Sequence, residues 1–523
     1  MTSDAARLAV WNALLASIAE EMGVTLGLSS HSPNIRERRD YSCGVFGTDG
    51  EMVAQAAHIP VHLGAMPEAI RAVQSLVPWR EGDVAIVNDP YLGGTHLPDI
   101  SLVAPVFWDE ELVAFLSNRA HHADVGGMSA GSMPLSTELY QEGVIIPPLR
   151  LYDAGKRNDE LLALILRNVR TPEERQGDFD AQMAAIRTGE QRLHELCRRY
   201  GPDEVAAEME ALKAYTERLT RAAISDIPDG TYHARDVMET PAGGEVGIVL
   251  QLTVAGEEMT FDFTGTAPEQ AASINAVAAV TRSAVAYCVR CLLPADAPSN
   301  EGGFRPLTFV LPEGSLVNAR PPRAVSAGNV ETSQRVTDVV FRALAEALPG
   351  RIPAASAGSM SNFTFGGQRG DGTPFAYYET IPGGAGAGPG SAGLAGVQTH
   401  MTNTANTPAE ALERTLPIRL WAFEIRDGSG GDGQHRGGDG VTKEVEALEG
   451  MQAALIADRR SHRPWGLAGG TDGLAGSDSV LRGGQGEERI GGHSQVRLEP
   501  GDRLRIETPG GGGWGPRSGD GAS

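Results

Sequence analysis

Apolar and polar residues alternate with two different periods along the first part of the chain. Apolar positions recur every three to four residues over 2–22 and again over 201–226, which predicts two amphipathic helices, the first ending at Gly23. Between these helices, Y-S-C-G-V-F and E-M-V-A-Q-A flank G-T-D-G and predict a β-hairpin. Strand-like alternation begins after I-P-D-G-T-Y, so we expect a domain boundary near residue 228.

Two further regions follow this boundary. Residues 229–415 mix strand patterns such as E-V-G-I-V-L-Q-L-T-V with helix patterns such as T-S-Q-R-V-T-D-V-V-F-R-A-L, which predicts a central α/β domain. Residues 416–523 carry only short strand patterns between glycine clusters, which predicts an all-β, glycine-rich domain. A chain of 523 residues is long enough for two or three hydrophobic cores. The expected fold is a mixed α/β (α+β) multi-domain protein with an N-terminal α/β region over residues 1–228.

Glycine is unusually frequent. The chain has 66 glycines, many of them in three clusters at 383–390, 428–440 and 509–515. The clusters are not periodic, which excludes a collagen-like or solenoid repeat, and none has the Lys-Ser/Thr and helix of a Walker loop. We interpret them as tight β-turns, with an anion-binding cradle as the alternative.

Charge and cysteine content exclude several classes of protein. The net charge of −23 argues against binding to nucleic acid or to an anionic membrane. No apolar run approaches the roughly 18 residues of a membrane helix, and no secretory signal is apparent, so we expect a cytoplasmic protein. Four cysteines do not make a disulfide framework. Cys288 and Cys291 lie on a helix pattern and are expected to be buried thiols rather than a zinc or redox pair.

Candidate metal ligands concentrate between residues 88 and 126. Imidazoles and carboxylates are ligands of hard or borderline divalent metals. The first group lies in a Gly/Pro loop after a buried strand, and the second follows the strand pattern 112–118. A β-hairpin or strand return would bring the two loops to one point. The residues concerned are Asp89, His96, Asp99, His121, His122 and Asp124.

The neighbours His121 and His122 should point in opposite directions if the strand continues, so one of them is a ligand and the other is not. Asp124 suits a hydrogen bond to a ring nitrogen. Asp40 follows R-E-R-R. It is either part of a solvated loop or a carboxylate, kept ionised by the arginines, that reaches the metal.

His58 and His62 flank Pro60 with a spacing unlike that of an H-E-x-x-H helix, so we expect substrate contact or plain packing. The sequence has no G-x-S-x-G elbow, and Cys43 lacks the surroundings of a catalytic nucleophile. Any nucleophile is therefore expected to be a metal-activated water.

Several longer motifs carry a family resemblance. They are S-P-N-I-R-E-R-R-D-Y-S-C-G-V-F, A-A-H-I-P-V-H-L-G-A-M, N-D-P-Y-L-G-G-T-H-L-P-D-I, A-H-H-A-D-V-G-G, M-T-N-T-A-N-T-P-A-E-A-L-E, G-N-V-E-T-S-Q-R and the closing P-G-G-G-G-W-G. Together they resemble the hydantoinase B / 5-oxoprolinase family over about residues 5–516. Members of that family include N-methylhydantoinase, 5-oxoprolinase and lactamase subunits, and also subunits of acetone and acetophenone carboxylases.

The resemblance implies the metal-bearing subunit of an ATP-dependent cyclic-amide hydrolase. In the family, an A-type partner uses ATP to phosphorylate the carbonyl oxygen of a hydantoin, 5-oxoproline or lactam ring, and water on the metal of the B-type chain attacks it. The missing Walker loop agrees with this division, and a hetero-oligomer such as α2β2 is expected. A carboxylase subunit and a non-catalytic scaffold for the ATP-using chain are the alternatives.

The resemblance also implies roles for individual residues. His96, Asp99 and His121 match the positions of metal ligands, with Asp40 as a further ligand. The metal would be zinc or manganese, and ATP would act through the partner. The neighbouring His122 and Asp124 are carried over as candidate catalytic residues.

Overall fold

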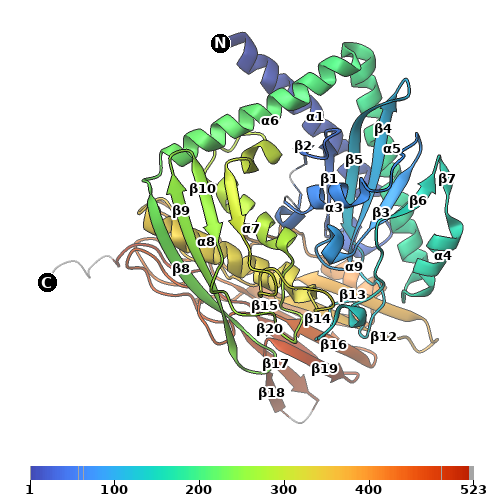
Figure 1. Cartoon of the computed structure of the whole chain (residues 1–523). Coiled ribbons are helices and arrows are strands. Elements are labelled where there is room, and N and C mark those ends of the chain that lie inside the picture. The colour runs from blue at the N-terminus through green and yellow to red at the C-terminus, as the bar shows by residue number, and fades with distance from the viewer. Residues whose placement is uncertain (1, 57, 63, 484–485, 518–523) are drawn as a thin grey trace.

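The computed structural model describes residues 2–56, 58–62, 64–483 and 486–517. It is a mixed α+β fold with four separate sheets. The N-terminal and central regions lie next to each other, and the strands of the last part of the chain form a layer beneath both (Figure 1). This arrangement confirms the expected fold class.

The N-terminal region is a seven-stranded sheet with the order β2-β1-β5-β4-β3-β6-β7. All of its paired strands are antiparallel. The strands are β1 Tyr41–Phe46, β2 Met52–Gln55, β3 Val84–Val87, β4 Asp99–Trp108, β5 Glu111–His121, β6 Leu149–Asp153 and β7 Lys156–Arg157. The helices are α1 Thr2–Ser29, α2 Pro33–Arg36, α3 Met66–Val73, α4 Asp159–Arg167, α5 Pro172–Tyr200 and α6 Pro202–Ser225, with 3-10 turns at Pro60–His62, Pro90–Leu92 and Leu139–Gln141.

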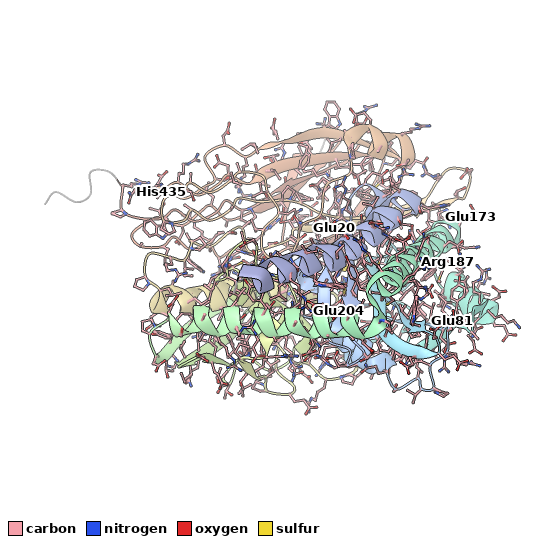
Figure 2. The ribbon with its side chains drawn as sticks, turned by 90° about the horizontal axis from the view of Figure 1, so that it is seen from above. Glu20, Glu81, Glu173, Arg187, Glu204 and His435 are labelled. Atoms are coloured by element: carbon pink, nitrogen blue, oxygen red, sulfur yellow. The ribbon has the colours of Figure 1, made fainter. Side chains whose placement is uncertain are left out.

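Long helices cover this sheet. Helix α1 packs along α5 and also touches α6, and Figure 2 shows Glu20 of α1 and Glu204 of α6 on the outer surface of this helical layer. The predicted hairpin is confirmed as β1 and β2, and the predicted helix 201–226 is confirmed as α6. The sequence patterns did not indicate α5, the 29-residue helix that precedes it.

The first helix continues past its predicted end at Gly23. Gly23 and Gly27 lie inside α1 and face the hairpin. A Cβ at Gly23 would lie 2.5 Å from the ring of His58, and a Cβ at Gly27 would lie 2.8 Å from the Tyr41 hydroxyl. The prediction was wrong because these glycines allow close packing against β1 and its neighbouring loop instead of ending the helix.

The central region has a four-stranded sheet with the order β11-β10-β9-β8. Its strands are β8 Gly230–Glu239, β9 Glu245–Ala255, β10 Glu258–Asp262 and β11 Leu307–Val310. Its helices are α7 Ala278–Arg290 and α8 Ser333–Ala347, with a 3-10 turn at Glu301–Phe304 and a π-helix at Gly328–Thr332. One continuous hydrophobic core joins this region to the N-terminal one.

Two antiparallel sheets, β13-β12-β16-β19 and β14-β15-β20-β17-β18, build the last layer. Helix α9 Ala409–Thr415 is the last helix among the described residues, which confirms an all-β C-terminal part. Strands β12 and β13 precede residue 415 yet pair with strands that follow it, so the boundary at 415 stays a prediction. The strands are β12 Asn362–Gln368, β13 Pro374–Thr380, β14 Ile418–Ile425, β15 Val441–Ala447, β16 Met451–Ile456, β17 Ser477–Arg482, β18 Gly486–Ile490, β19 His493–Leu498 and β20 Arg503–Glu507.

The three glycine clusters pack backbone against backbone, in an arrangement we call the glycine stack (383–390, 428–440 and 509–515). The Gly384 N–H donates to the Pro509 carbonyl at 3.0 Å, and the Gly511 N–H donates to the Gly438 carbonyl at 2.9 Å. A Cβ at Gly384 would lie 1.9 Å from that same Gly438 oxygen. The interpretation as tight turns holds for part of the clusters, as at Gly390 (φ 102°) and Gly428 (φ 81°). Gly384, Gly438 and Gly511 instead serve close approach between segments far apart in the sequence.

Cys288 and Cys291 differ in solvent exposure. Cys288 is buried in α7 as expected, whereas Cys291 is exposed just after the helix ends, and both are free thiols. None of the helices in the described residues is both long and apolar enough to span a bilayer.

Candidate metal centre

The register of the β4–β5 hairpin brings the two predicted loops together. Strand β4 begins at Asp99 and β5 ends at His121, and these two residues lie directly opposite each other in the pair. His96 precedes β4 by three residues. The turn before it needs glycine, because Gly93 has φ of 92° and a Cβ there would lie 2.5 Å from the Glu68 carbonyl oxygen.

Two imidazoles converge on one carboxylate oxygen. His96 Nε2 and His121 Nδ1 each lie 3.3 Å from Asp99 Oδ1, and all three side chains are buried. His96 Nε2 makes no hydrogen bond to any described residue. Ring nitrogens and a carboxylate within 4.8 Å of one another are a donor set for a divalent cation, so these residues fit the metal that the sequence predicts.

Backbone and side-chain contacts orient these donors. His96 Nδ1 lies 3.3 Å from the Ser326 carbonyl oxygen; a proton on Nδ1 would donate to it and leave the Nε2 lone pair free for a metal. Thr95 Oγ1 donates to Asp99 Oδ2 at 2.5 Å, and Asn329 Nδ2 donates to the same oxygen at 3.4 Å. Asp99 Oδ1 thereby remains directed at the two histidines.

Asp40 and His62 lie beside this group. Asp40 Oδ2 is 4.0 Å from His121 Nδ1 and 3.7 Å from the Arg38 guanidinium. His62 Nε2 is 3.3 Å from Asp99 Oδ2, and its Nδ1 is 2.8 Å from the Ser42 hydroxyl. Of the two histidines around Pro60, His62 thus belongs to the cluster, where sequence reasoning offered it only as a substrate contact or packing residue.

The structure places the other four candidates, His58, Asp89, His122 and Asp124, away from the cluster. Asp89 accepts from the Tyr91 N–H at 2.9 Å and caps the 3-10 turn Pro90–Leu92. His122 turns toward α5, where its Nε2 is 2.9 Å from the Gln182 side-chain oxygen. Asp124 accepts from Arg170 Nη1 at 2.9 Å and from backbone N–H groups of its own loop. His58 Nδ1 accepts from the Cys43 N–H at 3.2 Å. Burial lowers the pKa of both His58 and His122 to about 4, so both rings are neutral near pH 7.

The charges within the cluster shift one another's pKa values. Burial would raise the pKa of Asp99, but the adjacent His96 and His62 outweigh burial and hold it well below the ordinary value. Burial would lower the pKa of His96, but the Asp99 carboxylate raises it. For His121, burial dominates and the pKa is lowered. Protons would therefore compete with a bound metal ion for the same ring nitrogens.

A small cavity opens onto the cluster. Asp40, His62, Asp99 and His121 line it together with Asn329, Tyr378 and Thr404, and its volume is about 20 Å³. This is room for an ion or a water but not for a ring substrate, whose pockets are usually roughly 300 to 1,000 Å³. Thr404 also lines an adjoining surface hollow of about 600 Å³, and none of the residues that line this hollow is an Asp, Glu, Lys or Arg.

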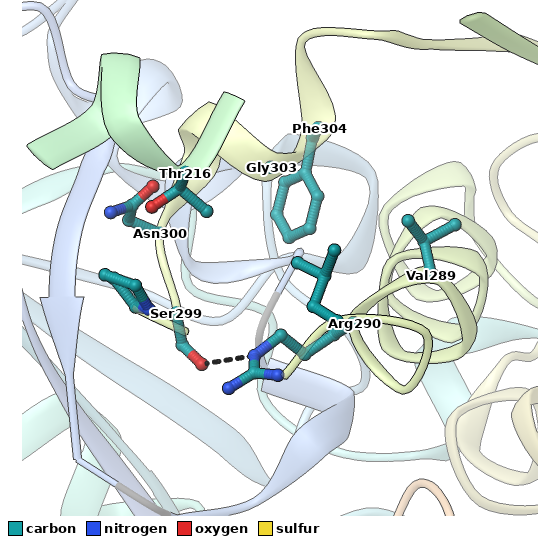
Figure 3. Close-up of a pocket in the computed structure, with 9 residues that line it drawn as sticks. Thr216, Val289, Arg290, Ser299, Asn300, Gly303 and Phe304 are labelled. Atoms are coloured by element: carbon teal, nitrogen blue, oxygen red, sulfur yellow. Dashed lines mark hydrogen bonds between the residues drawn. The ribbon is translucent and has the colours of Figure 1, made fainter. Parts of the chain in front are cut away.

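Two other polar groupings have their partners within the chain. Figure 3 shows the residues that line a cavity between α6 and α7. The volume of this cavity is about 10 Å³, and Arg290 in its wall donates to the Ser299 hydroxyl at 3.2 Å and to several loop carbonyls. The acidic group of Asp49, Glu51 and Glu210 surrounds the ammonium of Lys213. Neither leaves a donor set open for a ligand.

Comparison with known proteins shows the family of the chain. The family model for hydantoinase B/oxoprolinase matches residues 4–517. A 5-oxoprolinase of Arabidopsis thaliana is 40% identical over 98% of this chain, which spans only 42% of that longer protein. A protein of a Pseudomonas species, named as the B-type subunit of a D-/L-hydantoinase, is 32% identical over 96% of this chain and 88% of its own length.

Among solved structures, the ATP-dependent caprolactamase of Pseudomonas jessenii superimposes with a TM-score of 0.91 and 29% identity, covering 98% of this chain and 91% of that one. The family match and this superposition both extend over nearly the whole chain. The chain therefore belongs to the hydantoinase B/oxoprolinase family.

Proposed function

We propose that this chain is the metal-bearing, B-type subunit of an ATP-dependent hydrolase that opens a cyclic amide such as a hydantoin, 5-oxoproline or lactam. The convergence of His96 and His121 on Asp99, with Asp40 and His62 beside them, is the observation that carries the proposal. Their mixed nitrogen and oxygen donors suit zinc or manganese. Such an ion, when bound, supplies Lewis-acid activation and lowers the pKa of a water.

An ATP-using A-type partner completes the reaction in this proposal. The plant 5-oxoprolinase is more than twice as long as the stretch it shares with this chain, whereas the hydantoinase protein is of similar length. The partner would transfer the γ-phosphoryl group of ATP to the ring carbonyl oxygen. Water attack on that carbon then breaks the C–N bond and leaves an acyl phosphate, which a second water hydrolyses to a carboxylate and inorganic phosphate. A hetero-oligomer such as α2β2 would hold both subunits.

His122 and Asp124 take positioning roles in this proposal. The contact of His122 with Gln182 fixes the end of β5 against α5, and so fixes where the adjacent His121 ring points. Asp124 and Arg170 close the loop that follows. Both residues act through the geometry of His121 and not by touching the reacting atoms.

The substrate is proposed to enter from the uncharged hollow. Thr404 lines both the hollow and the metal cavity and so separates them. Arg38 holds the segment that contains Thr404 and Ala405: the Arg38 guanidinium donates to the Thr404 hydroxyl at 3.4 Å, and the Arg38 carbonyl accepts from the Ala405 N–H at 2.9 Å. Because the cavity is smaller than a ring, entry requires this segment to move.

Metal analysis combined with coupled activity tests the proposal. The purified chain should bind about one divalent ion, and the complex with its partner should open a ring at the expense of ATP. His96→Ala should lose both properties, while His233→Ala, at an exposed position on β8, should keep both. Intact metal content and activity in the His96 variant would refute the proposal. Product formation that depends on bicarbonate would instead assign the chain to a carboxylase.

A further inference from the structure

A π-helix places one carboxamide in the metal cavity. Residues Gly328–Thr332 form this π-helix at the start of α8, and all five are buried. Such i→i+5 turns are rare and occur most often at functional sites. Asparagine also has a low propensity for helix interiors, because its side chain competes for backbone hydrogen bonds. Asn329 therefore occupies a position that local propensity does not favour.

The packing of this segment requires its glycine. A Cβ at Gly328 would lie 1.7 Å from the Asn275 carbonyl oxygen, so a side chain at this position would push the segment away from the region around Asn275. The Thr332 hydroxyl is hydrogen-bonded to the Ile274 carbonyl, and the Ser333 hydroxyl donates to the Asn329 carbonyl at 2.6 Å. The backbone of Asn329 is thus held on both sides.

The two ends of the Asn329 side chain have different surroundings. Its Nδ2 donates to Asp99 Oδ2 at 3.4 Å, and the carboxylate fixes this orientation because a flipped amide would set two oxygens against each other. Its Oδ1 is buried and accepts no hydrogen bond within the described part of the chain. The residue is 4% exposed and lines the cavity that holds the metal ligands.

A buried acceptor costs free energy unless a water or a ligand supplies the donor that the chain does not, so this oxygen is available to a ligand with an N–H. A cyclic amide carries such an N–H directly on the bond that is to be broken. The other polar groups of the cavity are the metal ligands, His62 and hydroxyl groups, most of which have partners of their own.

We infer that Asn329 Oδ1 accepts the N–H of the ring amide that is to be opened, so that this site selects rings with a free N–H on the scissile bond and rejects rings alkylated at that nitrogen. The inference rests on the proposed function and narrows its substrate class. Asn329 is then a specificity-determining residue. It links the carboxylate that anchors the metal to the nitrogen that leaves the carbonyl carbon.

A pair of substrates that differ by one methyl group tests this inference. The complex of the full chain with its ATP-using partner is supplied with 2-pyrrolidinone and with N-methyl-2-pyrrolidinone. We expect kcat/KM to favour the N–H ring by about 100-fold, because the methylated ring leaves the buried Asn329 oxygen unsatisfied at a cost of roughly 1 to 3 kcal/mol. Asn329→Leu, of similar size, should reduce this preference to less than about 5-fold, with its loss confined to the N–H ring. The assays use saturating metal, because this variant also loses the donor to Asp99 Oδ2.

Matched variants keep the result interpretable. Because the same partner serves every variant, its own preference cancels in the ratio between variant and wild type. Asn168→Leu replaces an exposed carboxamide at the end of α4 and should leave the ratio unchanged. Asn329→Ala, which removes the acceptor without adding bulk, should give the same loss of preference as the leucine variant and serves if the latter does not fold.

Three outcomes would overturn the inference. Equal hydrolysis of both rings by the wild type would show that the site does not recognise the substrate N–H. An unchanged preference in Asn329→Leu and Asn329→Ala would place the selection elsewhere, and failure of both variants to bind metal even at saturating concentration would make Asn329 part of the metal site instead. If the wild-type complex binds metal but opens neither ring, the proposed function itself fails, and this inference falls with it.

Discussion

The metal centre and a second buried group, which we call the ionic cluster, stabilise their buried carboxylates in different ways. The ionic cluster joins β8, α8 and the segment after β16, and consists of Asp236, Arg335, Asp338, Asp458 and Arg459. Arg459 Nη2 lies 2.7 Å from Asp236 and 2.8 Å from Asp338, and Arg335 Nη1 lies 2.9 Å from Asp338. In the metal centre, by contrast, the Asp99 carboxylate faces imidazoles and uncharged donors.

The difference separates a structural cluster from a binding cluster. Buried carboxylates need a cation nearby, and the ionic cluster contains its own guanidinium groups. Asp99 forms no pair with Lys or Arg among the described residues, and the orphaned His96 Nε2 is directed at it. Asp338 has two guanidinium groups within 3 Å, so its counter-charge lies within the chain, whereas Asp99 would gain a full counter-charge from a bound cation.

The largest effect is expected from removing the acid that anchors the metal centre. Asp99→Asn takes away the charge on which His96 and His121 converge, so metal binding should be lost and coupled activity should fall by about 1,000-fold, or roughly 4 kcal/mol. Metal content and ring opening measure this. Asp371→Asn, at an exposed position in the β12–β13 turn, is the control. If Asp99→Asn retained its metal, the Asp99 carboxylate would not be needed for metal binding, and the proposed difference between the two clusters would be contradicted.

Breaking the ionic cluster should damage stability and spare the chemistry. Arg459→Ala leaves Asp236 and Asp338 short of a counter-charge and should lower the free energy of unfolding by about 3 to 5 kcal/mol. Urea denaturation measures the loss. Arg235→Ala, exposed on β8, should change stability by less than about 0.5 kcal/mol. Metal stoichiometry in the folded fraction of Arg459→Ala should equal that of the wild type; a lower value would couple the two clusters.

A smaller effect is expected from the hydroxyl that supports Asp99. Thr95→Val removes the donor to Asp99 Oδ2 and should weaken metal binding by about 10- to 100-fold, as losses of outer contacts at metal sites do. Competition with a chelator of known affinity measures the change. Thr95→Ser keeps the hydroxyl and should keep the affinity, so equal weakening in both variants would point to packing instead.

The pH dependence of stability offers the finest test of the ionic cluster. Burial raises the pKa of Asp338 to about 7, against the opposing pull of Arg335. The folded protein thus holds this proton to higher pH than the unfolded chain does. The contribution is fully present below about pH 4 and is lost as the pH rises toward 7. The unfolding free energy of the wild type relative to Asp338→Asn should therefore fall across this window, and parallel curves would contradict the assignment.

Local pairing explains which parts of the site the sequence could predict. Asp99 and His121 belong to one hairpin with a short turn, so their meeting follows from strand alternation and proximity along the chain. The sequence could not show which of His58 and His62 reaches the cluster, because this depends on how the 3-10 turn Pro60–His62 packs. The Val61 N–H in this turn donates to the distant Met401 carbonyl at 3.3 Å.

Distant segments explain what the sequence could not predict. Asn329 and Tyr378 reach the cavity from a π-helix and from β13, and Tyr378 stacks on His121 with 4.5 Å between ring centroids. A π-helix differs from an α-helix by one hydrogen-bond step, which hydrophobic spacing does not reveal. The glycine clusters likewise gave no sign of their partners, because close backbone packing leaves no pattern of side chains to follow.

The glycine stack has a consequence for how this protein can evolve. Substitutions at the first two bases of a glycine codon introduce a residue with a Cβ, and at positions such as Gly384, Gly438 and Gly511 that atom would lie within about 2 Å of a neighbouring backbone atom. Random mutagenesis aimed at a new ring preference would therefore lose variants throughout the glycine stack, which borders the hollow at Ala385. Libraries confined to the metal cavity and to the walls of the hollow outside the glycine stack avoid these losses.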